Sequence, residues 1–203
     1  MAAYTIQAVS EAGFPDWAQR EKAPINRCPW PEYPTLYPSF AQLAAAEEGL
    51  HVRLSSQEPE PVARHHQLND FVCRDSCLEF FFQPVPARPE YFNFEFNCEG
   101  TLYLGIGKDR QSNTKLFPQE EYRELFRVQP FQSAGEWGVA FFIPTAFIGR
   151  FLPEYNALAR HMRGNFYKCG DCTPRPHYQC WSGVAAPQPD FHRPECFGDL
   201  YRG

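Results

Sequence analysis

The stretch Tyr91-Phe92-Asn93-Phe94-Glu95-Phe96-Asn97 decides the fold class of this chain. Its three phenylalanines alternate with polar residues, so they point to one face of a strand while Asn93, Glu95 and Asn97 point to the other. Cys98-Glu99-Gly100 then supplies a turn signal, and residues 101–106 return as a second strand. The segment therefore predicts a β-hairpin with one apolar face.

Strand signals of this kind recur along the chain at short intervals, with turn residues between them. Residues 50–56 alternate apolar and polar side chains and form a predicted hairpin with residues 40–46. Further strands are predicted over residues 4–9, 75–83, 121–130, 137–143, 164–168 and 178–182. One short helix is predicted over residues 145–151, with Thr145 as its N-cap. The fold class is therefore all-β, an antiparallel, jelly-roll-like β-sandwich with few short helices.

The length of 203 residues suits one β domain that spans residues 1–203. Its 19 Phe, 10 Tyr and 20 Pro favour pleated surfaces, strand ends and turns. Residues 10–39 are rich in proline and aromatic residues, including Cys28-Pro29-Trp30-Pro31, so this segment is not a helix. Because it is too aromatic for a disordered linker, we expect an ordered segment packed on the sandwich.

The charge pattern argues against nucleic acid and membrane partners. The net charge is −5 and no run of Lys or Arg exceeds two residues, whereas nucleic-acid binding needs clustered cations. No apolar stretch approaches the roughly 18 residues of a membrane span. The start, Met1-Ala2-Ala3-Tyr4-Thr5, carries no signal-peptide pattern and predicts a cytoplasmic protein, whereas a chain trimmed of its signal peptide would be extracellular. The sequence carries no signal for the oligomeric state.

The eight cysteines are expected to be mostly free thiols, because a chain of this length does not need disulfides. Cys169-Gly170-Asp171-Cys172 is a Cys-x-x-Cys pair, but the prolines that follow preclude the helix on which a redox pair depends. A zinc site has the ligand types Cys169, Cys172, His177 and Cys180 available, with a final gap shorter than that of zinc knuckles. The alternative is unpaired thiols on a turn.

Asp75 and Glu79 share one strand face if the pairing of residues 75–83 is regular. Two carboxylates in such an arrangement suit the acid and base of a glycoside hydrolase. They equally suit calcium binding or hydrogen bonds with sugar hydroxyls, and a solvated strand face remains the alternative.

The C-terminal part holds the strongest candidate for a ligand platform. Trp181 follows the polar run His177-Tyr178-Gln179-Cys180, and Asn165 and Lys168 precede it closely. A pyranose ring has apolar C–H faces that pack on an indole, while its hydroxyls bind amide and charged groups. Trp181 is therefore either a solvent-exposed sugar platform or a core residue, and the first reading predicts an open ring beside a hollow.

Four parts of the sequence are similar to one known family. They are the strand Asp75 to Phe82, the strand Tyr91 to Asn97, the segment Trp137 to Pro144, and the tail, with Gly164-Asn165-Phe166-Tyr167-Lys168-Cys169-Gly170-Asp171 and Phe191-His192-Arg193-Pro194-Glu195-Cys196-Phe197-Gly198. The chain resembles the family 9 carbohydrate-binding module and its bacterial family-9-like relatives over roughly residues 40–200, and the tail is the most specific part.

The resemblance implies an antiparallel β-sandwich in which two tryptophans clasp a terminal sugar and polar side chains surround its hydroxyls. It implies Trp181 as one stacking residue, Glu79 as the strand carboxylate and Asn165 as the amide. The second tryptophan has no direct counterpart: Cys73 stands near that position, and the alternatives are Trp30, Phe71 and Tyr178. Further candidate ligand-binding residues are Asp75, Lys168, His177, Tyr178 and Arg193. Calcium ions in such modules are structural, so structural calcium is an expectation here.

Three hypotheses follow from these observations. The leading one is a non-catalytic domain that binds an oligosaccharide or sugar terminus by stacking a ring on exposed aromatic side chains. The first alternative is a small glycan-active hydrolase that uses Asp75 and Glu79. The second is a zinc-stabilised structural or interaction domain built on Cys169, Cys172, His177 and Cys180.

Overall fold

The computed structural model describes residues 2–9, 15–133, 135–156 and 159–203. The strands are β1 (Ala3–Ala8), β2 (Ala23–Pro24), β3 (Ser39–Ala46), β4 (Gly49–Ser56), β5 (Cys77–Gln83), β6 (Tyr91–Asn97), β7 (Leu102–Gly107), β8 (Thr114–Lys115), β9 (Gln129–Ser133), β10 (Glu136–Pro144), β11 (His161–Cys169), β12 (Tyr178–Cys180) and β13 (Gly198–Arg202). The short helices are α1 (Tyr122–Leu125) and α2 (Thr145–Gly149), with single 3₁₀ turns η1 (Trp17–Gln19), η2 (Val72–Arg74) and η3 (Pro194–Cys196). None of the described helices has the length and apolar character needed to cross a membrane.

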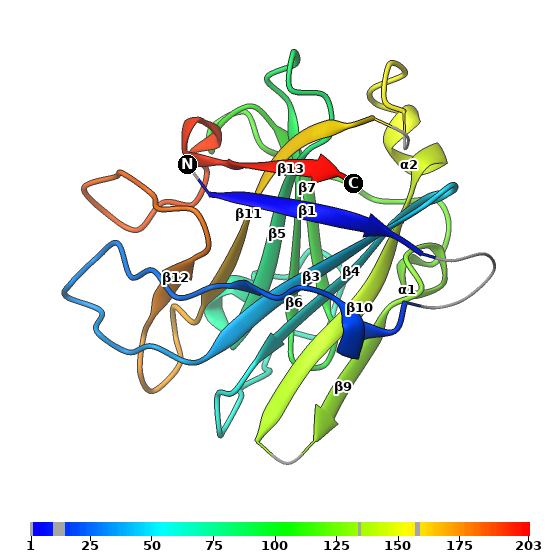
Figure 1. Ribbon diagram of the computed structural model, residues 1–203. Coiled ribbons are helices and arrows are strands. Elements are labelled where there is room, and N and C mark those ends of the chain that lie inside the picture. Colours follow the sequence, from blue (N-terminus) through cyan, green and yellow to red (C-terminus); the bar gives the residue numbers. More distant parts are fainter. Residues whose placement is uncertain (1, 10–14, 134, 157–158) are drawn as a thin grey trace.

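Hydrogen bonds join the strands in the order β8-β7-β6-β5-β11-β13-β1-β3-β4-β10-β9, with β12 on β11 and β2 on β3. The path curls into two layers (Figure 1). Strands β8, β7, β6, β5, β11 and β13 form one layer, and β3, β4, β10 and β9 form the other. Strand β1 joins them, because residues 3–6 pair with β13 and residues 7–8 pair with β3. The all-β sandwich predicted from the sequence is confirmed.

The antiparallel prediction needs one correction, at β1. Both of its pairings are parallel, whereas every other pairing between the described strands is antiparallel. A tight hairpin turn imposes the antiparallel direction on most neighbouring strands. No hairpin links β1 to β13 or β3, which lie far from it along the chain, so its direction is set by the two layers.

The core lies between the two layers, where Phe94 and Phe96 of β6 meet Phe141 of β10. Their ring centroids lie 5.7 and 4.7 Å from that of Phe141. The alternation predicted for residues 91–97 therefore holds, with the phenylalanines inside. Gly100 turns the chain from β6 into β7 with a φ of +75°, a backbone conformation that favours glycine. The polar face of β6 points away from this core, and this second face positions the candidate site.

Two local predictions differ from the structure. Residues 121–130, predicted as a strand, form helix α1 and the start of β9. The side chain of Glu121 accepts hydrogen bonds from the amides of Arg123 and Glu124, so a local cap starts a helix where the residue pattern suggested a strand. Helix α2 begins at Thr145 as predicted, but Pro144 is its N-cap residue and no side chain caps it.

The Pro-rich segment 10–39 packs against the sandwich over its described part, while residues 10–14 lie outside the described residues. Strand β2 pairs with β3, and Arg27 forms a β-bridge with Cys180. The indole of Trp30 is buried, and its Nε1 donates a hydrogen bond to the carbonyl of Ala186 at 2.8 Å. These contacts attach the segment to the C-terminal tail.

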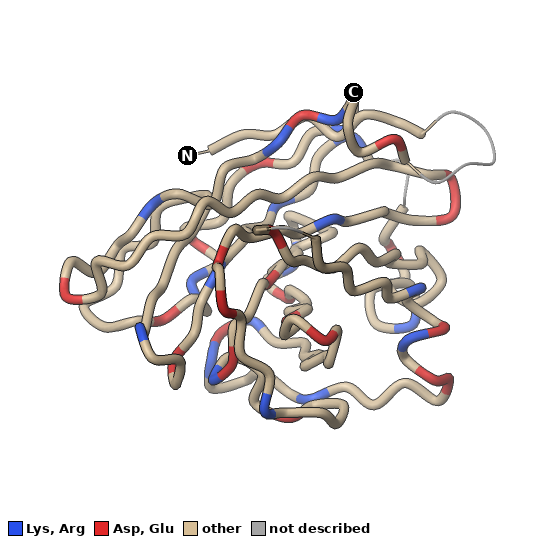
Figure 2. Tube along the Cα trace, turned by 90° about the horizontal axis from the view of Figure 1, so that it is seen from below, with Lys and Arg blue, Asp and Glu red and all other residues tan. Residues whose placement is uncertain are grey.

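Charged residues of both signs are interspersed along the chain, many of them in the loops that connect the strands, as Figure 2 shows. Exposed pairs include Arg150 with Glu120 at 2.5 Å and Arg88 with Glu154 at 2.6 Å. Water screens exposed ion pairs of this kind, so they add little to stability and the fold depends mainly on its apolar core.

Candidate functional site

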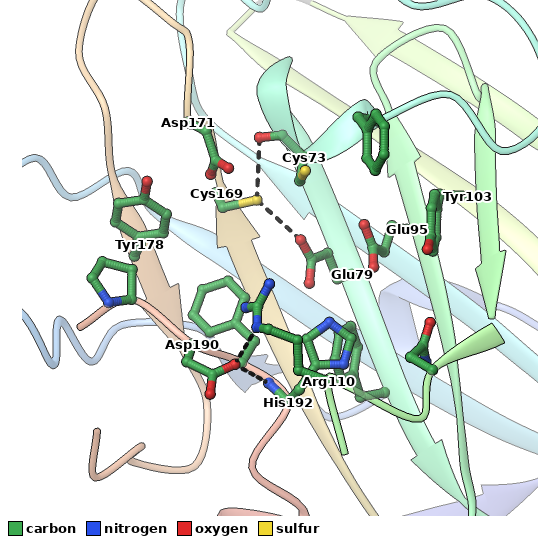
Figure 3. A pocket seen from close by; sticks show the side chains of 15 residues that line it. Cys73, Glu79, Glu95, Tyr103, Arg110, Cys169, Asp171, Tyr178, Asp190 and His192 are labelled. Atoms are coloured by element: carbon green, nitrogen blue, oxygen red, sulfur yellow. Dashed lines mark hydrogen bonds and ion pairs between the residues drawn. The ribbon is translucent and has the colours of Figure 1, made fainter. Parts of the chain in front are cut away.

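A cavity of about 310 Å³ lies on the outer face of the layer formed by β7, β6, β5 and β11 (Figure 3). One row of side chains crosses this face in register: Tyr167 of β11, Glu79 of β5, Glu95 of β6 and Tyr103 of β7. Because side chains alternate along a strand, these residues point away from the phenylalanine core. The complete lining is Phe71, Cys73, Glu79, Phe81, Glu95, Tyr103, Arg110, Asn113, Cys169, Asp171, Tyr178, Pro189, Asp190, Phe191 and His192.

Three acidic side chains lie at the bottom and side of this cavity. Glu79 and Glu95 are 2% and 6% exposed and face each other across neighbouring strands. Burial, together with the charge of Glu95, raises the pKa of Glu79 well above its usual range. Burial also raises the pKa of Glu95 to about 7, and that of Asp171 above its usual range. Burial therefore disfavours the charged form of each of these carboxyl groups.

Arg110 is the positively charged side chain of the cavity lining, and its Nε donates a hydrogen bond to Asp190 Oδ1 at 2.9 Å (Figure 3). Burial raises the pKa of Asp190, but the hydrogen bond and charge of Arg110 outweigh it and hold that pKa below its usual range. His192 Nδ1 lies 2.7 Å from the Tyr91 hydroxyl. Burial, then the charge of Arg110, lowers the pKa of His192 to about 4, so this imidazole is neutral at pH 7.

Aromatic rings form two walls of the cavity. Phe71 is 50% exposed and stacks on Tyr103, with ring centroids 6.3 Å apart and an interplanar angle of 26°. Tyr178 lies on the other side. Its ring packs edge-on against that of Trp30, with the two ring centroids 5.9 Å apart. Phe191 stacks on Tyr167 at 4.1 Å. Lys115 Nζ and Arg74 Cζ lie over the Phe71 ring, 4.5 and 5.3 Å from its centroid, and the part of the ring that stays exposed is an apolar surface beside buried polar groups.

The sequence profile of the family described as Carbohydrate-binding family 9 matches residues 14–201. That match covers most of the chain. The protein belongs to carbohydrate-binding family 9. The search of curated proteins finds no match.

Solved structures share the fold of this family 9 domain. A candidate carbohydrate-binding protein from Bacteroides uniformis has a TM-score of 0.84 and 24% identity, over 99% of both chains. A family 9 carbohydrate-binding module from Caldicellulosiruptor kristjanssonii, in complex with glucose, has a TM-score of 0.65 and 10% identity, over 100% of this chain and 96% of that one. The same organism's module in complex with cellotriose has a TM-score of 0.64 and 11% identity, over 100% and 94%. The family match makes the protein a non-catalytic carbohydrate-binding domain, and the solved structures share its fold.

The structure places Trp181 of this family 9 domain in the core, so the expectation of a solvent-exposed indole shelf is wrong. Trp181 is 6% exposed, and its ring centroid lies 5.3 Å from that of the core residue Phe166. A Cβ at Gly198 would lie 2.5 Å from the indole Cζ3, so the glycine leaves space for the ring. The amide of Trp181 donates to the carbonyl of Phe166, which keeps the residue against β11 on its inner side.

Lys168 and His177 also lie away from the cavity. Lys168 is next to Cys169 on β11 and therefore points to the opposite face, where its Nζ lies 3.0 Å from a Glu58 carboxylate oxygen and 2.5 Å from His177 Nε2. His177 Nδ1 lies 2.8 Å from the carbonyl oxygen of Arg175. Burial, then the charge of Lys168, lowers the pKa of His177 to about 3. Both side chains are fully buried, so they stabilise the fold instead of contacting the cavity.

The side chains of Asn165 and Asp75 likewise form hydrogen bonds with backbone groups. The side chain of Asn165 bonds both the amide and the carbonyl of Ser182, at 2.9 and 2.8 Å. Asp75 precedes β5 and accepts hydrogen bonds from the amides of Arg64 and His65 and from Asn97 Nδ2. Burial raises the pKa of Asp75, but these hydrogen bonds outweigh it and lower the pKa. Asp75 does not line the cavity with Glu79, so the predicted acid–base pair of a hydrolase is not formed.

Two of the predicted sugar-binding residues, Glu79 and Tyr178, line the cavity, as do Cys169 of the predicted zinc site and Phe71, one of the alternatives for the second stacking ring. Arg193 lies at the edge, where its Nε is 3.0 Å from Asp190 Oδ2. The sequence interpretation missed Glu95, although it stands on the polar face of the strand that decided the fold. It also missed Tyr103, Arg110, Asn113, Asp171, Asp190 and His192. Of this set, the two quoted tail motifs contain Asp171 and His192.

The predicted zinc ligands Cys169, Cys172, His177 and Cys180 do not converge. His177 lies on the inner face with Lys168, whereas Cys169 points into the cavity and Cys172 is exposed. All eight cysteines are free thiols. Within the described ranges, a different group, Cys77, Glu79 and Cys169, brings its ligand atoms within 4.8 Å of one another. Structural calcium stays a prediction.

Proposed function

We propose that this carbohydrate-binding domain holds the end unit of a neutral oligosaccharide in the cavity beside β5, β6 and β7. The observation that carries the proposal is the half-exposed ring of Phe71, stacked near Tyr103 directly beside Glu95. An apolar ring face next to polar groups matches the two surfaces of a pyranose, whose C–H face packs on aromatic rings and whose hydroxyls need hydrogen bonds.

The size of the cavity favours binding of one terminal sugar unit over binding of a long stretch of polysaccharide. Its volume of about 310 Å³ is near the lower end of the about 300–1,000 Å³ that is typical of small-molecule sites. Tyr178 on one side and Tyr103 on the other limit how far a ligand can extend through it (Figure 3). The carbohydrates in the two Caldicellulosiruptor complexes, glucose and cellotriose, are both neutral, which makes them the first ligands to test.

The charges in the cavity support a neutral sugar. Burial raises the pKa of Glu79, Glu95 and Asp171 and so disfavours their charged forms, and a carboxyl group can hydrogen-bond a sugar hydroxyl in either protonation state. An anionic sugar would instead raise the cost of any ionised carboxyl group in the same low-dielectric space. Arg110 offers less compensation, because its guanidinium already pairs with Asp190.

Isothermal titration calorimetry with glucose, cellobiose, cellotriose and xylobiose tests the proposal. We expect saturable one-to-one binding of at least one of these sugars, and weaker binding of the uronic acid that corresponds to it. Incubation with the bound oligosaccharide should release no new reducing ends, because the domain is non-catalytic. Absence of binding across these sugars and a broad glycan array would refute the proposal, as would preferential binding of the uronic acid.

A further inference from the structure

Two thiols and one carboxyl group converge below the cavity. Cys77 of β5 and Cys169 of β11 are direct partners across the antiparallel pairing. Glu79 follows Cys77 by two residues and therefore points to the same face. The ligand atoms of the three residues lie within 4.8 Å of one another, and Cys169 Sγ lies 3.0 Å from Glu79 Oε1. All three side chains are buried, so the geometry is held by two paired strands.

The surroundings of this group have an excess of acidic side chains. Glu95 faces Glu79 across the β5–β6 pairing, and Asp171 lies at the cavity wall. Among the residues that line the cavity, Arg110 is the one Lys or Arg side chain, and it is already paired with Asp190. Buried acidic groups need a cation or protons for compensation. A divalent cation at the bottom of the cavity would supply that compensation.

We propose that Cys77, Glu79 and Cys169 form a site for a thiol-preferring divalent cation, with Zn²⁺ as the expected ion. Thiolate and carboxylate are both common zinc ligands, and three protein ligands with one open position are a recurrent zinc arrangement. The open position faces the cavity, because Glu79 and Cys169 line it. Calcium fits this group less well, since it takes six to eight oxygen ligands. On binding, two thiol protons and the carboxyl proton pass to solvent while three bonds to the cation form.

This site goes beyond the proposed sugar binding. Glu79 takes part in both proposals, but the cation site does not need the stacking surface. Metal binding needs the pair of strands β5 and β11, whereas the proposed stacking surface is Phe71 beside Tyr103, contributed by the η2 segment and β7. The two proposals therefore fail separately. A domain that binds Zn²⁺ but no sugar would refute only the function, and one that binds sugar but no Zn²⁺ would refute only the site.

Cobalt substitution of the full chain tests the site under reducing conditions. Wild-type protein is treated with a chelator, dialysed and titrated with Co²⁺ and then with Zn²⁺. We expect one Co²⁺ per chain, with thiolate-to-cobalt charge-transfer absorption and visible bands typical of four-coordinate cobalt, and displacement of Co²⁺ by Zn²⁺. Elemental analysis of protein loaded with Zn²⁺ and dialysed should also give one zinc per chain.

Variants locate the site. Cys77→Ser and Cys169→Ser should each lower the affinity for Co²⁺ at least tenfold, and Glu79→Gln should weaken it with the charge-transfer absorption retained at saturation. Cys172→Ser is the matched control, because Cys172 is an exposed thiol outside the group and should leave the titration unchanged. Circular dichroism confirms that each variant is folded; if one Cys→Ser variant unfolds, Cys→Ala at the same position and Glu79→Gln carry the test.

Three results would overturn the site. They are wild-type protein that binds no Co²⁺ or Zn²⁺, charge-transfer absorption that survives in Cys77→Ser and Cys169→Ser, and loss of the absorption in Cys172→Ser. A Cys77–Cys169 disulfide that persists under the reducing conditions, measured as two missing thiols of the eight, would also overturn it, because the disulfide removes both sulfur ligands.

Discussion

Replacing Phe71 with alanine removes the most exposed aromatic face of the cavity. Complete burial of a phenylalanine side chain stabilises by about 1.5–3 kcal/mol. Phe71 is 50% exposed and Lys115 and Arg74 lie over its ring, so at most about half of that surface is free to be covered by a sugar. A ligand that covers it would gain about 0.75–1.5 kcal/mol, and its loss corresponds to about a four- to thirteen-fold weaker Kd. Because the ring is only half-buried in the free protein, the free energy of unfolding should fall much less than for a core phenylalanine.

Calorimetric titration of the variant and the wild type with the same saccharide measures this change, and chemical denaturation follows stability in parallel. Phe117→Ala is the matched control: Phe117 is 68% exposed and lies by a different hollow with Phe151 and Arg150. We expect its Kd to equal that of the wild type. The reasoning is refuted if Phe71→Ala binds with wild-type affinity, or if Phe117→Ala loses as much affinity as Phe71→Ala does.

Three further predictions concern residues that were expected to bind the ligand but are buried away from the cavity. Trp181→Ala should lower the free energy of unfolding by about 3–5 kcal/mol, with sugar affinity of the folded protein unchanged in calorimetry; a tenfold loss of affinity would contradict this. Lys168→Met should destabilise by about 3–5 kcal/mol in urea titration, because Glu58 loses its buried partner; an unchanged midpoint would argue against the ion pair. His177 has a folded pKa of about 3, below that of an unfolded histidine, so the unfolded state binds more protons between these values and stability falls as pH drops from about 6.5 towards 3. His177→Gln should flatten this slope by up to about 1.4 kcal/mol per pH unit in denaturation series, and equal slopes would exclude the buried neutral imidazole.

Much of the fold follows from local sequence patterns. The alternation in residues 91–97 and 50–56 places side chains on two faces wherever these segments form strands, and both strands occur as predicted. The prediction over residues 121–130 was wrong because the cap formed by Glu121 stabilises a helix of one turn, a local effect that alternation does not report. The parallel pairings of β1 depend on how the two layers meet, which no single segment encodes.

The site was predictable only in part. Glu79 could be found because its strand motif resembles the family, and Tyr178 because it belongs to the polar run before Trp181. Trp181 was assigned to the wrong side, since a tryptophan beside polar residues has the same sequence signal on either face of a sandwich. Arg110 comes from a loop after β7 and reaches the cavity through its pairing with Asp190, a contact that spans 80 residues of sequence.

By itself, the sequence determined the β-sandwich class and membership of carbohydrate-binding family 9, because both are recorded in short-range alternation and in contiguous motifs. Only the tertiary structure decided which side chains share the cavity. Side-chain direction reverses with every residue along a strand, so the register of β5 against β6 and β11 brings Glu79 together with Glu95 and Cys169. The same alternation turns Lys168 to the opposite face, where it lies buried beside Glu58.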